Sequence, residues 1–260
     1  MKTLLLDLDG TMYRGDAVIE SAKIFLEACQ KHKIPYIFLT NNSMRTREEN
    51  VSHMEKMGYR GIKPEQFYNS AMASVQYVKT HYTGNKAYYL GKAGLWQALT
   101  EEGFRITDQD PDFVFVGLNK EATYAEYSKA LTFLLQGAKL IGTNQDRILA
   151  KPDGFEIGNG SVVAMFEYAS NQKSPDIAKP HTPILDLCLR HYDLQKEDVI
   201  LIGDNLETDI LLGKNAGVET VFVQTGVHMA KDISRLGIEP DHIVTDLRDC
   251  LDFSFGSFML

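Results

Sequence analysis

The chain has 260 residues, of which 44% are hydrophobic and 24% are charged, and this length predicts one large domain or two smaller ones. These proportions are typical of globular proteins and argue against a disordered or fibrous chain. The formal net charge of −8 argues against a broad nucleic-acid-binding surface, which needs a basic excess to neutralise phosphates.

Neither membrane insertion nor a disulfide framework is expected. No apolar run approaches the length that crosses a bilayer, and the apolar start of the chain ends at Asp7, too early for a signal peptide. The three cysteines are odd in number and far apart in the sequence, so they predict neither disulfides nor a zinc site. The simplest interpretation is a reducing, cytoplasmic location.

Strands and helices are expected to alternate along the whole chain. Apolar runs predict strands at residues 3–8, 34–39, 87–90, 113–116, 139–142, 199–202 and 218–223. Helical spacing, capping boxes and glycine stops predict helices near residues 22–29, 46–57, 70–82, 95–102, 123–137, 183–192 and 210–216. This alternation predicts a parallel sheet covered on both faces.

Two carboxylates lie at the end of the first predicted strand, in the run Asp7-Leu8-Asp9-Gly10-Thr11. In an open parallel sheet, ligands bind beyond the carboxyl ends of the strands. Carboxylates that leave the sheet toward one crevice repel each other unless a cation or a proton offsets them. The run therefore predicts a chemical site. The structural alternative is an acidic turn, because Asp-Gly is common in turns.

Polar residues also follow the second predicted strand. Thr40, Asn41 and Asn42 offer a hydroxyl, two amide side chains and backbone N–H groups, which suit a phosphate or another oxyanion. On its own, this run is more often a polar turn or a helix N-cap than an anion site.

A second acidic group follows the strand predicted at residues 199–202. Asp204 would lie close to Asp7 and Asp9 if their strands are neighbours, and three acidic residues with nearby carbonyls suit Mg²⁺. The alternative is that Asp204 caps the next helix.

Lys179 precedes Pro180 and would supply positive charge to a phosphoryl group and to the crowded carboxylates. Its alternative is a solvated surface lysine.

Taken in chain order, an Asp pair, a hydroxyl, a lysine and a second acidic pair resemble the four motifs of the haloacid dehalogenase (HAD) superfamily over nearly the whole chain. The runs Asp7–Thr11, Thr40–Arg47 and Gly203–Asp209 are most similar to subfamily IIA, the NagD-type and p-nitrophenyl-phosphatase-like enzymes, although Ala178 stands where many members have Gly. The resemblance implies an α/β fold. A Rossmann-like parallel-sheet core (1–82 and 176–260) would carry an inserted αβ cap domain of the C2 type (83–175).

This resemblance implies a Mg²⁺-dependent phosphatase that hydrolyses small phosphomonoesters through an aspartyl-phosphate. Asp7 would be the nucleophile, and Asp9 would protonate the leaving group and then take a proton from water. Mg²⁺ would be held by the carboxylates of Asp7 and Asp204 and by the backbone carbonyl of Asp9.

The remaining motif residues would bind the phosphoryl group or orient its ligands. The groups expected to hold the phosphoryl oxygens are Thr40, Asn41, Asn42 and Lys179. Asn205 and Asp209 would orient metal-bound water or Lys179.

The inserted domain would close over the crevice and exclude water. Its loop Thr143–Asp146 follows a predicted strand, and Asn144 and Asp146 are the candidate specificity residues; a plain strand-to-loop turn is the alternative. The expected partner is a small phosphorylated metabolite, with neither nucleic acid nor membrane. A homodimer is left open, because similar enzymes form dimers through their caps.

Other functions use similar residues. A phosphotransferase or phosphomutase of the same superfamily would pass the phosphate to another acceptor. A receiver-like signalling module would keep the phospho-aspartate as its signal, but receivers are shorter and their phosphoacceptor follows a later strand. The intact acid Asp9 argues against a binding protein with a dead site and against a dehalogenase.

Overall fold

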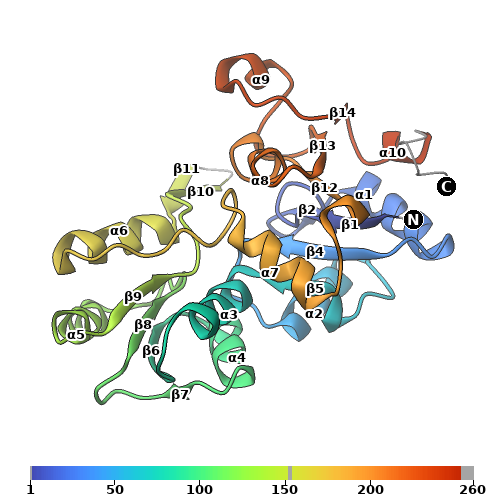
Figure 1. Cartoon of the computed structure of the whole chain (residues 1–260). Coiled ribbons are helices and arrows are strands. Elements are labelled where there is room, and N and C mark those ends of the chain that lie inside the picture. The colour runs from blue at the N-terminus through green and yellow to red at the C-terminus, as the bar shows by residue number, and fades with distance from the viewer. Residues whose placement is uncertain (1, 152–153, 253–260) are drawn as a thin grey trace. The chain divides into compact units, whose positions relative to one another are not determined.

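The chain folds into two compact units in a computed structural model that describes residues 2–151 and 154–252 (Figure 1). The core unit comprises Met1–Thr40, Arg47–Tyr68 and Lys179–Leu260. The inserted unit comprises Asn41–Thr46 and Asn69–Ala178. It therefore contains the predicted insertion at 83–175 together with residues 69–82, residues 176–178 and a short segment directly after Thr40.

The core unit is built around a six-stranded sheet in the order β14-β13-β12-β1-β4-β5. The pairings from β14 through to β4 are parallel. Every residue of β1, β4 and β12 is buried, which is the pattern of parallel strands covered on both faces. The strands are β1 (Thr3–Leu6), β4 (Tyr36–Thr40), β5 (Phe67–Asn69), β12 (Val199–Gly203), β13 (Glu219–Val223) and β14 (His242–Val244).

Helices of the core unit pack their apolar sides on this sheet. Helix α1 (Glu20–Lys31) buries Ala22, Phe25, Leu26 and Cys29, at the spacing that predicted it. The other helices are α2 (Arg47–Lys56), α7 (Pro183–His191), α8 (Leu211–Ala216), α9 (Lys231–Leu236) and α10 (Asp249–Asp252). The short pieces are the hairpin β2 (Tyr13–Arg14) and β3 (Ala17–Val18), the 3₁₀ turns η1 (Pro64–Gln66) and η2 (Lys196–Asp198), and the π-helical turn η3 (Leu206–Ile210).

The inserted unit has its own parallel sheet, in the order β7-β6-β8-β9. Its strands are β6 (Lys86–Leu90), β7 (Arg105–Ile106), β8 (Phe113–Val116) and β9 (Lys139–Gly142), and β10 (Ile148–Lys151) pairs with β11 (Gly154–Ile157) in an antiparallel hairpin. Its helices are α3 (Ser70–His81), α4 (Ala93–Glu101), α5 (Tyr124–Leu135) and α6 (Asn159–Ser170).

The predicted capping box at the start of α5 is confirmed. The Glu126 N–H donates to Thr123 Oγ1 at 3.2 Å, and the Thr123 N–H donates to Glu126 Oε2 at 2.7 Å. Two backbone donors that the helix leaves unpaired are thereby satisfied.

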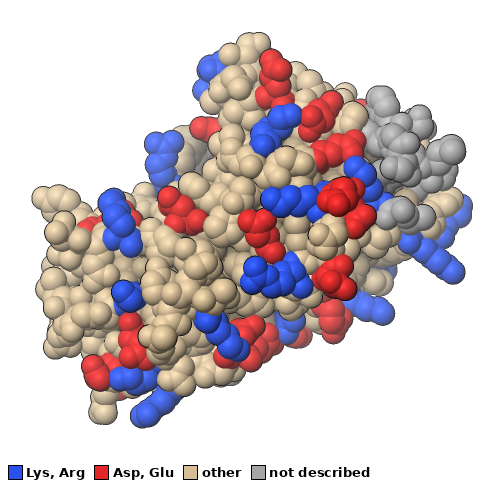
Figure 2. Space-filling model, in the orientation of Figure 1, with Lys and Arg blue, Asp and Glu red and all other residues tan. Residues whose placement is uncertain are grey.

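Charged side chains of both signs are interspersed on the face shown in Figure 2. Among the described residues, no helix combines the length and the apolar character needed to cross a bilayer.

Candidate active site

Neighbouring strands of the core unit bring Asp7 and Asp204 together. Strands β1 and β12 pair in parallel with Leu6 opposite Ile202, and the Asp7 N–H donates to Ile202 O at 2.9 Å. Both aspartates follow the carboxyl ends of these strands. One carboxylate oxygen from each of Asp7, Asp204 and Asp209 lies within 4.8 Å of the others, and all three residues are buried. The acidic residues thus form one cluster at the sheet edge.

Lys179 is a buried member of this cluster, so the interpretation as a solvated surface lysine is wrong. Its side chain is 2% exposed, and its Nζ donates to Asp7 Oδ1 at 2.6 Å, to Asp209 Oδ1 at 2.7 Å and to Leu39 O at 2.9 Å. These three acceptors match the three N–H groups of an ammonium. In this arrangement Lys179 compensates charge and orients Asp7.

Asp209 lies on the π-helical turn η3, and its carboxylate joins two parts of the cluster. While Oδ1 accepts from Lys179, Oδ2 accepts the Asn205 N–H at 3.2 Å. The Asn205 side chain caps η3, because its Oδ1 accepts the Glu207 N–H at 3.0 Å. Asp209 therefore has the predicted contact with Lys179 and also lies among the carboxylates that could ligate a metal.

The cluster carries more negative than positive charge. Three carboxylates and one ammonium sum to −2 when all are ionised. Burial raises the pKa of Asp7 well above its usual range, with repulsion from Asp209 and Asp204 adding to the effect and Lys179 opposing it. Burial, followed by repulsion from Asp209, raises the pKa of Asp204 to about 7. Burial alone would lower the pKa of Lys179, but Asp209 and Asp7 outweigh it and raise the pKa above its ordinary value.

A divalent cation fits this charge and this chemistry. The −2 imbalance equals the charge of one divalent ion, and carboxylate and carbonyl oxygens are the ligands that a hard cation such as Mg²⁺ prefers. The clustered carboxylates of Asp7, Asp204 and Asp209 are the groups that could hold it.

The turn after Asp7 packs directly against Asp204. Thr11 Oγ1 donates to Asp204 Oδ1 at 3.1 Å. Gly10 has a φ of +91°, and a Cβ at this position would lie 2.3 Å from Asp204 Oδ2. Gly10 is therefore required both by its backbone conformation and by the approach of the carboxylate.

Asp9 and Thr40 lie at the same edge of the sheet. Asp9 is exposed two residues beyond Asp7, and Thr40 is the buried last residue of β4, the other neighbour of β1. Their roles as acid and phosphate ligand stay predictions.

Asn41, Asn144 and Asp146 are bonded to one another within the inserted unit. Asn41 Nδ2 donates to Asp146 Oδ1 at 3.2 Å, and Asn144 Nδ2 donates to Asn41 O at 2.8 Å. The Asp146 N–H donates to Asn144 Oδ1 at 3.2 Å, while Asn42 Oδ1 accepts the Met44 N–H at 3.0 Å. The polar turn that was the alternative interpretation is therefore present at Asn42, and phosphate binding by Asn41 and Asn42 stays a prediction.

Sequence reasoning missed Asn159, which anchors the candidate specificity loop. Its Nδ2 donates to Val116 O at 3.0 Å and lies 3.3 Å from both Thr143 Oγ1 and Asn144 O. The residue is 1% exposed at the start of α6, a helix that was not predicted. A buried asparagine has no distinctive pattern in one sequence, so no signal marked it.

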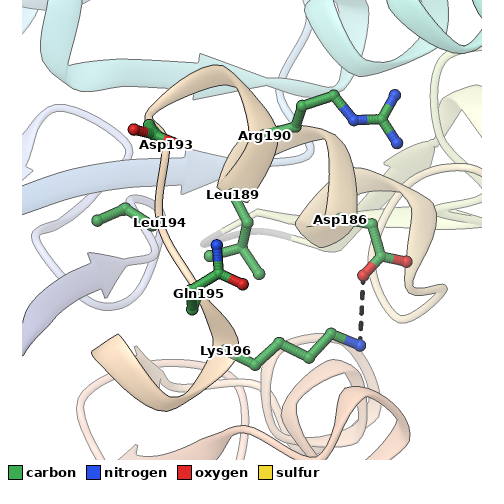
Figure 3. Close-up of a pocket in the computed structure, with 7 residues that line it drawn as sticks. All are labelled: Asp186, Leu189, Arg190, Asp193, Leu194, Gln195 and Lys196. Atoms are coloured by element: carbon green, nitrogen blue, oxygen red, sulfur yellow. Dashed lines mark ion pairs between the residues drawn. The ribbon is translucent and has the colours of Figure 1, made fainter.

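A surface hollow beside α7 takes no part in this cluster (Figure 3). Its volume is about 320 Å³, and Lys196 Nζ lies 3.3 Å from Asp186 Oδ1 at its wall, with both side chains 45% exposed. The lining residues are Asp186, Leu189, Arg190, Asp193, Leu194, Gln195 and Lys196. None of them belongs to the motifs, so the acidic cluster is the candidate site.

Comparison with known proteins places the chain in a family. Residues 4–105 match the family model described as haloacid dehalogenase-like hydrolase, and residues 176–250 match the one described as HAD-hydrolase-like. An acid sugar phosphatase of Staphylococcus haemolyticus is 36% identical over 247 residues, which are 95% of this chain and 94% of the relative. The chain belongs to the haloacid dehalogenase-like hydrolases.

Solved structures of this family have the same fold. NagD from Escherichia coli K-12 is 31% identical, with a TM-score of 0.86 over 96% of this chain and 98% of that chain. The 4-nitrophenylphosphatase from Thermotoga maritima is 27% identical, with a TM-score of 0.89 over 96% of each chain. Among haloacid dehalogenase-like hydrolases, the chain is thus of the NagD type, with a Rossmann-like core and a cap domain. Hydrolases of this superfamily generally use a divalent metal ion and an aspartyl intermediate.

Proposed function

We propose that this haloacid dehalogenase-like hydrolase is a Mg²⁺-dependent phosphatase that hydrolyses small phosphomonoesters, sugar phosphates among them. The observation that carries the proposal is the Asp7 carboxylate, held by Lys179 at 2.6 Å in a cluster whose charge a divalent ion would balance. The names of the relatives, acid sugar phosphatase and 4-nitrophenylphosphatase, support this reaction and this class of substrate.

Asp7 acts as the nucleophile. One of its oxygens attacks phosphorus in line, the bond from phosphorus to the ester oxygen breaks, and the phosphoryl group stays on Asp7. Asp9 gives a proton to the departing alkoxide in this first half of the reaction. In the second half, Asp9 takes a proton from water while the water oxygen attacks phosphorus, and inorganic phosphate leaves with Asp7 restored.

Lys179 supports the attack through its charge and its hydrogen bonds. By donating to Asp7 Oδ1, it fixes the carboxylate and leaves the other oxygen to face phosphorus. Its positive charge also offsets the approach of an anionic substrate to the acidic cluster. Thr40, Asn41 and Asn42 are the groups that we expect to donate hydrogen bonds to the phosphoryl oxygens.

Mg²⁺ would be held by the carboxylates of Asp7 and Asp204 and by the Asp9 backbone carbonyl, with Asp209 among the neighbouring oxygens. When bound, it would supply positive charge to the transferring oxygens and shield Asp7 from the charge of the substrate. Asp209 and Asn205 keep Lys179 and the turn after β12 in place.

Substrate preference is proposed to depend on the loop that holds Asn144 and Asp146. Asn144 is buried and hydrogen-bonded within the inserted unit, so it would set the shape of the loop, whereas Asp146 would also act through its charge.

A homodimer and a cytoplasmic location complete the proposal. Three free and buried cysteines are compatible with a reducing compartment.

Hydrolysis of p-nitrophenyl phosphate tests the proposed reaction. Purified protein stripped with EDTA should be inactive and should regain turnover when Mg²⁺ is added. Asp7→Asn keeps the shape of the side chain but loses the nucleophile, and it should abolish turnover at every Mg²⁺ concentration. Undiminished activity in Asp7→Asn would remove the residue from its proposed role. A panel of sugar phosphates and nucleoside monophosphates, read by phosphate release, then identifies the substrate class.

A further inference from the structure

The loop after β13 touches both acidic turns of the candidate site. We call residues Thr225–His228 the clasp. Thr225 Oγ1 donates to Gly10 O at 2.7 Å, and the backbone N–H of Val227 donates to Asp204 Oδ2 at 2.7 Å. His228 Nδ1 accepts the Leu206 N–H at 3.1 Å, so the clasp is bonded to the turn after β1 and to the turn after β12.

Close packing at Gly226 shows how tightly the clasp holds Asp204. A Cβ built on Gly226 would lie 1.8 Å from Asp204 Oδ2 and 2.3 Å from its Cγ, far inside van der Waals contact. The backbone of the clasp therefore lies directly against the carboxylate. Since Thr11 donates to the other oxygen, Oδ1, each carboxylate oxygen has a fixed donor and its plane is set from two sides.

A second set of bonds keeps the clasp itself in place. Arg14 Nε donates to Thr225 O at 2.6 Å, and the His228 N–H lies 3.4 Å from Asp204 O. Neither Thr225 nor Gly226 belongs to a motif assigned to catalysis, yet together they contact the backbone of Gly10 and the side chain of Asp204.

We propose that the clasp is the positioning element that orients Asp204 and fixes its distance from the Asp7 turn, and that its geometry thereby sets the affinity for a divalent cation. A ligand that is held in advance loses less freedom when a metal binds, so outer contacts of this kind contribute to metal affinity. Gly226 acts by leaving room for the carboxylate, and Thr225 acts by holding the turn after Asp7. The proposal rests on the metal requirement of the proposed function.

Calorimetric titration of EDTA-stripped protein with MgCl₂ tests the clasp without any substrate. Gly226→Ala should raise the dissociation constant for Mg²⁺ about 10- to 100-fold, because the added Cβ would displace the Asp204 carboxylate and changes in the surroundings of a metal ligand usually have effects of this size. With p-nitrophenyl phosphate, turnover at low Mg²⁺ should fall and should recover at high Mg²⁺. Met229→Ala, an exposed neighbour outside the clasp, is the control and should bind Mg²⁺ like the unmodified protein.

Thr225→Val provides the second test, because it keeps the shape of the side chain and removes only the hydrogen bond to Gly10 O. It should weaken Mg²⁺ binding several-fold, and it decides the question if circular dichroism shows that Gly226→Ala does not fold. A folded Gly226→Ala or Thr225→Val that binds Mg²⁺ within twofold of the unmodified protein overturns the proposal. Since calorimetry needs no turnover, failure of the phosphatase assay in the unmodified protein would count against the proposed function and not against the clasp.

Discussion

The stability of the metal-free protein should fall as the pH rises from 5 to 8, because Asp204 keeps a proton in the folded state that it loses in the unfolded state. Burial and Asp209 raise the pKa of Asp204 from 3.8 to about 7. Between these two values the native state binds more protons than the unfolded state. The resulting contribution to stability is fully present at low pH and is lost as the pH rises through the folded pKa. Asp7 shifts in the same direction.

The size of the effect follows from the shift at Asp204. Between pH 5 and pH 7 the native state holds about one additional proton, and each pH unit then costs about 1.4 kcal/mol. Metal-free protein should therefore be about 3 kcal/mol less stable at pH 8 than at pH 5, which corresponds to several degrees in melting temperature. Carboxylates in surface ion pairs, such as Asp232, Asp241 and Asp246, have lowered pKa values, so they titrate below this window.

Thermal unfolding of EDTA-treated protein at several pH values measures the slope with which stability falls as the pH rises. Asp204→Asn removes the titrating group with little change of shape and should make the slope shallower, whereas Asp186→Asn, at a half-exposed position beside Lys196, should leave it unchanged. Saturating Mg²⁺ should stabilise the protein more at pH 8 than at pH 5, because protons compete with the ion for the carboxylates. A metal-free protein that is as stable at pH 8 as at pH 5 would refute the assignment of a buried, protonated Asp204.

Three further predictions concern single side chains. Asp9→Asn should slow the hydrolysis of alkyl phosphates about 10²- to 10⁴-fold and that of p-nitrophenyl phosphate less, because nitrophenolate needs little protonation; equal losses would contradict the acid role. Lys179→Met should destabilise the metal-free protein by about 3–5 kcal/mol in urea unfolding, more at pH 8 than at pH 5, because it leaves buried carboxylates unpaired. Lys196→Met, at an exposed pair, should change stability by less than about 1 kcal/mol, and a similar loss in both would contradict the argument. Asp146→Ala should reorder the substrate ranking in the phosphate panel, and an unchanged ranking would show that the loop does not set specificity.

Long apolar runs made much of the core predictable. The strands expected at 3–8, 34–39 and 199–202 correspond to β1, β4 and β12, whose residues are buried on both faces. Short elements were missed, because β2, β3 and β7 have two residues each and are defined by pairing rather than by composition. Helix α6 was also missed. It begins after Gly158 and carries a second glycine in its first turn, and glycine disfavours helices. Its large apolar residues Tyr168 and Met165 are exposed, so the hydrophobic residues do not follow the helical repeat of a single buried face.

Strand ends made the centre of the acidic cluster predictable, since Asp7 and Asp204 directly follow β1 and β12. The sequence could not predict which hydrogen bonds the groups of the cluster make with one another. Lys179 donates to Asp7, Asp209 and Leu39 O, a result of packing that no local pattern encodes. The clasp had a weaker signal, because Thr225 and Gly226 also follow a strand of the same sheet.

Proton binding, metal binding and the stability of the fold all depend on the acidic cluster. The sheet of the core unit ends in three buried carboxylates and a single buried ammonium, and the protein can relieve their repulsion either by binding protons or by binding a divalent ion. Protonation stabilises the fold but occupies the oxygens that a metal needs, and it weakens Asp7 as a nucleophile. A clasp that holds Asp204 rigidly favours the metal over the proton, because a metal requires several oxygens in fixed positions whereas a proton requires only one. We therefore expect variants with a loosened clasp to need both more Mg²⁺ and a higher pH to reach the same turnover.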